Sequence, residues 1–222
     1  LAFFFGMTPY TYFSHHLGMH HPENNMPEDL SSTMKYQRDS FLGFLHYYLS
    51  FAVLGIFTLS LYFIRHGRWR FFRMAVLGEL SWYAAVTLAF WYLPEPTFIV
   101  LILPWLLTRF LLMAGNWTQH AFVDTTDGNN PYVNSITFID SPYNKRCFND
   151  GYHIGHHVNM NRHFLDMPQD FLDNLSTYRE NKAVIFRKLD YFMIWFLLMT
   201  KQYRILSRFF VNISAKEMSR DE

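Results

Sequence analysis

The chain has 222 residues, of which 50% are hydrophobic, 20% are aromatic and only 17% are charged, and its net charge is +1. Soluble domains carry about 25% charged residues, so this composition favours a membrane protein. The small net charge, without a basic stretch interleaved with aromatic residues, argues against a nucleic-acid partner. Cys147 is the single cysteine, which excludes an internal disulfide and a metal site built on cysteines.

Three apolar segments follow one another along the chain. Residues 41–64 are uncharged, and residues 74–93 and 97–114 each contain one charged residue. A helix that crosses a bilayer needs about 20 apolar residues, so all three segments qualify or nearly qualify. Histidine clusters lie before the first segment and after the last, and three crossings would place them on opposite sides of the membrane.

Charge distribution resolves this conflict. The four arginines in residues 65–73 mark that loop as cytoplasmic, whereas the turn at 94–96 has no Lys or Arg. We therefore predict a transmembrane hairpin of residues 74–93 and 97–114, with residues 41–64 re-entrant or interfacial. An ordinary span over 41–64 is the alternative, and it would contradict a metal site shared by the clusters.

The sequence thus predicts an all-α membrane protein of one domain, residues 1–222, with a transmembrane hairpin and a cytoplasmic helical cap that carries the histidine clusters. Residues 1–6 are interpreted as the tail of a hydrophobic helix that starts upstream, so we expect the domain to be truncated at its N-terminus. Residues 191–212 are apolar and then basic, which favours a helix lying at the membrane interface.

Histidines account for 11 residues, and most of them fall into clusters with helical spacing. His16 and His20 stand four residues apart, which places them on one face of an α-helix. His15 is an alternative to His16, although its five-residue separation from His20 suits an α-helix less well. The candidate metal ligands are His16, His20, His21, His120, His153, His156 and His157.

Neutral imidazoles placed together by local structure are what a metal site requires. Zinc takes four ligands, so seven histidines indicate two metal ions, although imidazole suits zinc, copper, iron and nickel alike. No Glu-x-x-His pair is present, so the carboxylate type of di-iron bundle does not fit. Asp124, Asn149 and Asp150 adjoin the clusters and either hold the distal ring nitrogens or cap helices.

The clusters resemble those of a known family. His16–His21, with the pattern HxxxHH, and His153–His157, with the pattern HxxHH, are similar to the later two of three histidine boxes in membrane fatty acid desaturases and related hydroxylases. Asn116–His120 resembles an Asn-xxx-His element of acyl-CoA desaturases and membrane alkane hydroxylases. The resemblance covers about residues 10–170. It implies that the seven histidines bind iron, that Asn116 acts through water or behind the ligands, and that a first box lies upstream of Leu1.

This resemblance also implies a function. Two iron ions, O2 and electrons from an external donor would desaturate the acyl chain of a lipid. Hydroxylation of an alkane, sterol or carotenoid at the same centre is one alternative, and a non-catalytic metal-binding membrane protein is another. No haem or dinucleotide motif is visible, so we expect a cytochrome b5-like or ferredoxin-like electron donor. The protein would be a multi-pass integral membrane protein with its active site on the cytoplasmic face.

Overall fold

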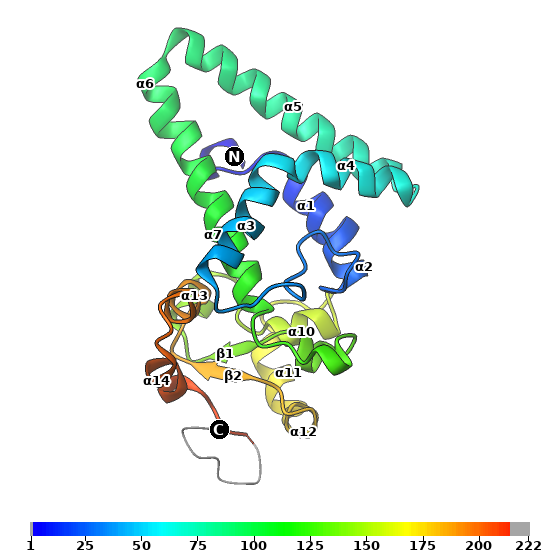
Figure 1. Ribbon diagram of the computed structural model, residues 1–222, viewed down its shortest axis with the longest axis vertical. Coiled ribbons are helices and arrows are strands. Elements are labelled where there is room, and N and C mark those ends of the chain that lie inside the picture. The colour runs from blue at the N-terminus through cyan, green and yellow to red at the C-terminus, as the bar shows by residue number, and fades with distance from the viewer. Residues whose placement is uncertain (1, 214–222) are drawn as a thin grey trace. The chain divides into compact units, whose positions relative to one another are not determined.

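The computed structural model of the chain describes residues 2–213, and within them most residues are helical. Two compact units make up the chain, and each is described by itself. Unit 1 comprises Leu1–Glu23, Pro27–Ser31 and Leu45–Met113, and unit 2 comprises Asn24–Met26, Ser32–Phe44 and Ala114–Glu222. The helical character and the long apolar helices confirm the predicted all-α membrane fold (Figure 1).

The start of unit 1 differs from the expected helix tail. Residues Ala2–Phe5 form the 3-10 helix η1, which ends at Gly6 with a φ of 70°. A side chain at Gly6 would meet the backbone oxygen of Pro104 at 2.2 Å, so only glycine fits this turn. The chain then enters α1 (Thr11–His15), which continues through the π-helix η2 (His16–His20) into α2 (His21–Glu23).

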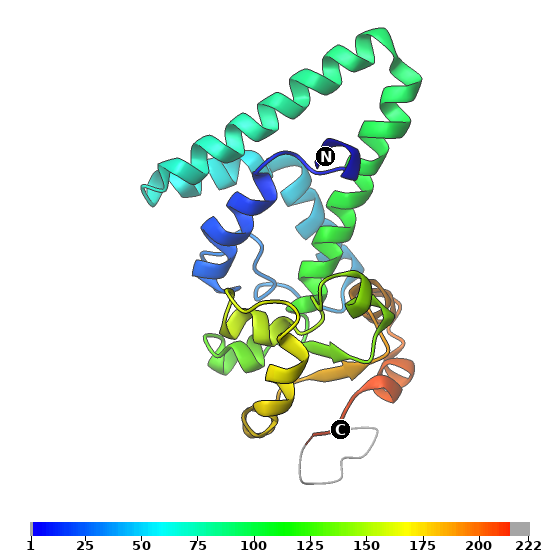
Figure 2. The same ribbon diagram turned by 180° about the vertical axis from the view of Figure 1, so that it is seen from behind.

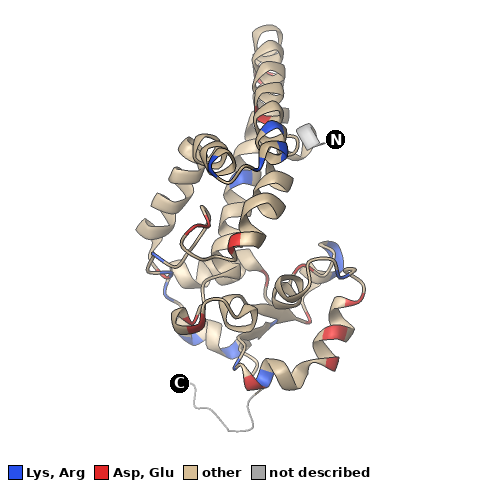
Figure 3. Cartoon of the chain, turned by 90° about the vertical axis from the view of Figure 1, so that its right-hand side faces the viewer, with Lys and Arg blue, Asp and Glu red and all other residues tan. Residues whose placement is uncertain are grey.

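Within residues 2–213, three long helices are apolar enough to cross a membrane: Phe41–Arg65, Trp69–Tyr92 and Pro94–Gln119. Charged residues are sparse along them (Figure 3). The segment expected to be re-entrant or interfacial is therefore one helix of 25 residues, long enough to span. Its placement in the bilayer stays a prediction. The parts of these helices are α3 (Phe41–Leu49), η3 (Ser50–Leu54), α4 (Gly55–Arg65), α5 (Trp69–Tyr92), α6 (Pro94–Thr97), η4 (Phe98–Ile102) and α7 (Leu103–Gln119).

The predicted hairpin corresponds to α5 and the helix that begins with α6. Pro94 is the first residue of α6, a position where the missing N–H of proline costs no hydrogen bond. Only Leu93 separates α6 from the end of α5 at Tyr92. Within unit 1 the rings of Trp82 and Trp105 stack with centroids 4.8 Å apart. Arg109 Nη2 lies 2.6 Å from Glu79 Oε1; the Glu79 side chain is buried, and that of Arg109 is 11% exposed. Stacking and this ion pair therefore join the two helices of the hairpin.

A small apolar core fixes the histidine-bearing helix within unit 1. Met19 of η2 is fully buried with Tyr62 and Phe63 of α4 and Ala75 of α5. Burying side chains of this size contributes roughly 1.5–3 kcal/mol each. Met19 thus orients the helix that also carries His16 and His20.

Unit 2 contains a two-stranded parallel sheet, in which β1 (Thr137–Ile139) pairs with β2 (Ile185–Arg187), seen from behind in Figure 2. The N–H of Phe138 donates to Gly151 O, which ties the segment before α10 to the sheet. Phe138 and Ile185 are fully buried. The helices after α7 are η5 (Thr125–Asp127), α8 (Pro131–Asn134), α9 (Pro142–Arg146), α10 (His153–Val158), α11 (Met167–Asp173), α12 (Leu175–Glu180), α13 (Tyr191–Met199), α14 (Tyr203–Leu206) and η6 (Ser207–Phe209).

The expected single helix over 191–212 is broken. Lys201 has a φ of 55°, and the N–H of Gln202 donates to Leu197 O, which are features of a helix-terminating Schellman turn. Ile194 of α13 is fully buried in the core of unit 2, whereas Phe196 is 53% exposed. An interfacial position therefore stays a prediction for the exposed face of α13 only.

Candidate metal centre

His16 and His20 lie on the π-helix η2 rather than on an α-helix, and His21 follows as the first residue of α2. In a π-helix the hydrogen bonds join residues five apart, and such segments are frequent at functional sites. His16 consequently approaches His21, with their Nε2 atoms 3.1 Å apart. The ring of His20 lies 5.6 Å from that of His16. All three predicted ligands of the first cluster converge, but the closest pair is His16 with His21, not His16 with His20.

His15 is brought beside His20 by the same five-residue spacing. Their rings stack at 6.3 Å with an interplanar angle of 9°, and the edge of His15 faces Phe51. Burial lowers the pKa of His15 to about 4, so this ring is neutral at physiological pH. Because it is His16 that shares close contact with His21, His15 is better described as a wall of the cluster than as a replacement for His16.

Asp29 supports the first cluster. Its Oδ2 lies 2.7 Å from His20 Nδ1, and both residues are buried. Its Oδ1 accepts hydrogen bonds from the N–H and the hydroxyl of Ser31. Burial alone would raise the pKa of Asp29, but the charge and hydrogen bond of His20 and the hydrogen bond of Ser31 lower it well below its usual range. The ionised carboxylate fixes the ring of His20, which directs Nε2 away from it as a metal ligand.

Three further histidines converge in unit 2. The Nε2 atoms of His153 and His157, four residues apart on α10, are 3.0 Å from each other, as the predicted helical spacing requires. The ring of His120, just after α7, lies 5.5 Å from His153 and 5.1 Å from His157. Ligand nitrogens of the three residues lie within 4.8 Å of one another. His156 lies next to this group, with its ring 5.7 Å from that of His153.

Neutral groups hold the ring nitrogens of unit 2. His120 Nδ1 lies 2.6 Å from the backbone oxygen of Asn134, and His157 Nδ1 lies 3.1 Å from Asn24 Oδ1. Asn134 Nδ2 donates to Asn24 O, and Asn25 Nδ2 donates to Asn134 Oδ1. This asparagine network orients His120 and His157. Two of its members, Asn24 and Asn134, are 110 residues apart in sequence.

The residues predicted to support the ligands have other partners. Asp124 takes the capping role, since its side chain accepts from Thr126 N at the start of η5. Asn149 donates to Phe164 O. Asp150 accepts from the Tyr143 hydroxyl at 2.9 Å, and burial raises the pKa of Asp150 to about 6. Asn116 lies one turn before His120, and its backbone oxygen accepts from the N–H of His120.

Sequence reasoning therefore missed Asp29, Asn24 and Asn134. Asp29 left a signal, because it is an acidic residue in the loop directly after a histidine cluster, where carboxylates often hold metal-binding imidazoles. The asparagines left none, since Asn134 acts on His120 through its backbone oxygen.

Both groups have a donor set that suits a transition metal. Imidazole nitrogens bind metals at about 2.0–2.1 Å, so adjacent ligands of an octahedral ion lie about 3 Å apart. The measured separations are 3.1 Å in unit 1 and 3.0 Å in unit 2. These separations match those of neighbouring ligands on one metal ion, and the Nδ1 atoms of His20, His120 and His157 are held by neighbouring groups.

Comparison with known proteins gives one match. The fatty acid desaturase family model matches residues 1–189, a range that contains all seven candidate ligands. No curated protein and no solved structure matches the chain significantly.

Proposed function

Because the chain belongs to the fatty acid desaturase family, we propose that it uses O2 to desaturate the acyl chain of a lipid at a histidine-ligated di-iron centre. Enzymes of this family are oxidoreductases that act on lipids in membranes, which agrees with the three long apolar helices. The observation that carries the proposal is the close approach of Nε2 atoms in two separate histidine groups.

The proposed ligands are the seven histidines of the two groups. Three imidazoles in each unit, with His156 beside the second group, exceed the needs of one ion. Iron is the metal proposed because the family uses iron, and imidazole accepts it. Asn116 is proposed to act through water. The seven residues are His16, His20, His21, His120, His153, His156 and His157.

A bound iron pair would activate O2, so that O2, two electrons from the donor, two protons and two hydrogen atoms from adjacent carbons of the acyl chain would give a double bond and two water molecules. The protein residues orient the ligands. Asp29 holds the ring of His20, and the backbone oxygen of Asn134 holds that of His120. Neutral His15 closes one side of the first group without adding a charge. Fixed ring orientations keep the ligand geometry constant as the charge on the metal changes.

The cytoplasmic side is the proposed location of the centre. Four arginines cluster in residues 65–73, where the first two candidate spans meet, and this bias marks the cytoplasmic side. A cytochrome b5-like or ferredoxin-like protein is the proposed electron donor on that side. Desaturation or hydroxylation is decided by the product, since an alkene indicates the first and an alcohol the second.

The test is His157→Ala in the full-length protein, purified in detergent. We expect product formation to fall at least about 100-fold and bound iron to decrease, because a ligand is lost. His163→Ala is the matched control, since His163 is exposed, its Nδ1 accepts from Leu165 N and its ring contacts Phe164. Full iron content and activity in His157→Ala would refute the assignment.

A further inference from the structure

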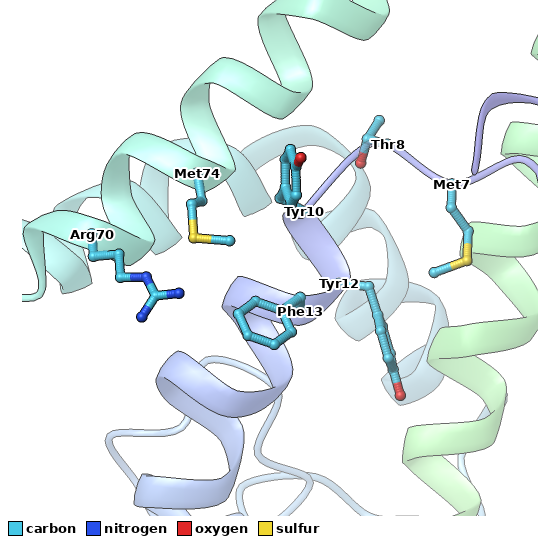
Figure 4. A pocket seen from close by; sticks show the side chains of 7 residues that line it. All are labelled: Met7, Thr8, Tyr10, Tyr12, Phe13, Arg70 and Met74. Atoms are coloured by element: carbon cyan, nitrogen blue, oxygen red, sulfur yellow. The ribbon is translucent and has the colours of Figure 1, made fainter. Parts of the chain in front are cut away.

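Unit 1 contains an open pocket that the proposed chemistry does not use. Its volume is about 340 Å³. One wall comes from the segment leading into α1 and from α1 itself, and the other comes from the first turns of α5 (Figure 4). The lining residues are Met7, Thr8, Tyr10, Tyr12, Phe13, Arg70 and Met74.

The lining is almost entirely apolar or aromatic. Phe13 and Tyr12 are 41% and 44% exposed, and Tyr10 is 61% exposed. Ligand pockets range from about 300 to 1,000 Å³, so this one accommodates part of a hydrocarbon chain but not a whole lipid. Large apolar side chains facing outward around a hollow are expected where hydrocarbon is the neighbour.

Arg70 is the one charged residue among the seven that line the pocket. It is exposed, and no ion pair or hydrogen bond of its side chain is found among residues 2–213. Arg68, in contrast, lies 3.7 Å from Glu23 and donates to Gly18 O. Arg70 therefore offers an uncompensated cation at the edge of an apolar hollow.

The position of Arg70 along the chain indicates which anion it meets. It lies in the segment 65–73, which contains four arginines and no acidic residue. This segment joins the candidate spans Phe41–Arg65 and Trp69–Tyr92, and so it lies at the level of lipid headgroups if these helices cross the membrane. Basic residues beside a transmembrane helix attract anionic lipids.

The pocket also touches the first histidine group. Tyr12 lines the pocket, and its ring stacks on that of His16 with centroids 5.0 Å apart and an interplanar angle of 16°. Phe13 contacts Phe71 of α5. A ligand in the pocket would therefore lie against the side chain that supports a candidate metal ligand.

We propose that this pocket binds a membrane phospholipid with an anionic headgroup. Its phosphate pairs with Arg70, and part of one acyl chain lies against Met7, Phe13 and Met74. The bound lipid packs on Tyr12 and thereby stabilises the helix that carries His16. This site is additional to the centre where the acyl substrate is oxidised.

The experiment uses the full-length protein in a neutral detergent. Phosphatidylglycerol or phosphatidylcholine with identical acyl chains is added, and the melting temperature and lipid retention in native mass spectra are measured. We expect phosphatidylglycerol to raise the melting temperature more than phosphatidylcholine. Arg70→Ala should weaken phosphatidylglycerol binding about tenfold, which corresponds to about 1.4 kcal/mol.

Arg65→Ala is the matched control, because Arg65 is exposed on the same basic segment but does not line the pocket. It should retain binding, as should Arg70→Lys, which keeps the charge. Met74→Trp should block binding by filling the pocket while leaving every arginine in place. Unchanged iron content of each variant without added lipid verifies its fold.

Three outcomes would overturn the proposal. Equal weakening by Arg65→Ala and Arg70→Ala would show a general surface charge instead of a site. Unchanged binding by Met74→Trp would show that the pocket is not used. Displacement of phosphatidylglycerol by an acyl-CoA at equal or lower concentration would show that a soluble thioester is the occupant.

Discussion

Asp29 in unit 1 and Asp150 in unit 2 each lie close to a histidine group, yet their environments shift their pKa values in opposite directions. At Asp29, burial alone would raise the pKa, but the charge and hydrogen bond of His20 and the hydrogen bond of Ser31 lower it well below its usual range. At Asp150, burial dominates over the hydrogen bond of Tyr143 and raises the pKa to about 6. The first acid faces an imidazole, whereas the second faces a phenol that offers a single neutral hydrogen bond.

The histidine groups of unit 1 and unit 2 therefore hold their candidate ligands by different means. An ionised carboxylate on His20 makes that imidazole a stronger donor to a metal. In unit 2 the corresponding partners, the backbone oxygen of Asn134 and the amide of Asn24, are neutral. We therefore expect the metal affinity of the first group to depend more strongly on its supporting residue.

The largest effect should come from Asp29→Asn. Removing the charge behind His20 should lower iron affinity about 10–100-fold, the usual cost of losing such a support. Asn24→Ala should cost less, because the partner lost by His157 is neutral. Competition with a chelator measures both affinities, and Glu28→Gln, an exposed neighbouring carboxylate, is the control. Equal losses for Asp29→Asn and Asn24→Ala would break the contrast between the groups.

The next largest expected effect is a loss of stability when the packing of the π-helix η2 is disturbed. A side chain at Gly18 would meet Cγ of Phe71 at 2.7 Å, so Gly18→Ala should destabilise the protein by about 1–3 kcal/mol through overpacking. Gly115 of α7 has nothing within 4 Å of such a position, and Gly115→Ala should stabilise the protein by up to about 1 kcal/mol. Thermal unfolding in detergent distinguishes the two. Tolerance of Gly18→Ala would contradict the close contact of η2 with α5.

The pH dependence of protein stability tests the raised pKa of Asp150 in unit 2. Because its folded pKa of about 6 exceeds the unfolded value of 3.8, the unfolded state ionises first, and stability falls as pH rises from about 4 to about 6. Asp150→Asn keeps an acceptor for Tyr143 and should be more stable by roughly 1–2 kcal/mol above pH 6, with no gain below pH 4. Unfolding measured across this pH range tests the shift, and a gain independent of pH would contradict it.

Much of the fold was predictable because its signals are local. The apolar segments gave the long helices, with α5 beginning at Trp69 rather than at residue 74. The spacing of His153 and His157 gave their contact on α10. A 3-10 turn at Ala2–Phe5 replaced the expected helix tail because the positive φ of Gly6 ends it.

The remaining features depend on contacts distant in sequence. The sequence of His16–His20 is compatible with an α-helix or a π-helix, and the packing of Met19 and Gly18 decides between the two. Strands of three residues, such as β1, are too short to show an alternating pattern. Asn24 and Asn134 meet only after folding, so no spacing rule could have assigned them to the histidines.

The ion pair between Glu79 and Arg109 has a consequence for biogenesis. Each charge alone, near the centre of an inserting helix, would cost about 2.5–3.5 kcal/mol on insertion scales. Glu79 also accepts from the Thr8 hydroxyl, and the guanidinium of Arg109 lies over the ring of Trp105. We therefore expect α5 and α7 to enter the bilayer most favourably as a pair, with the two charges already joined.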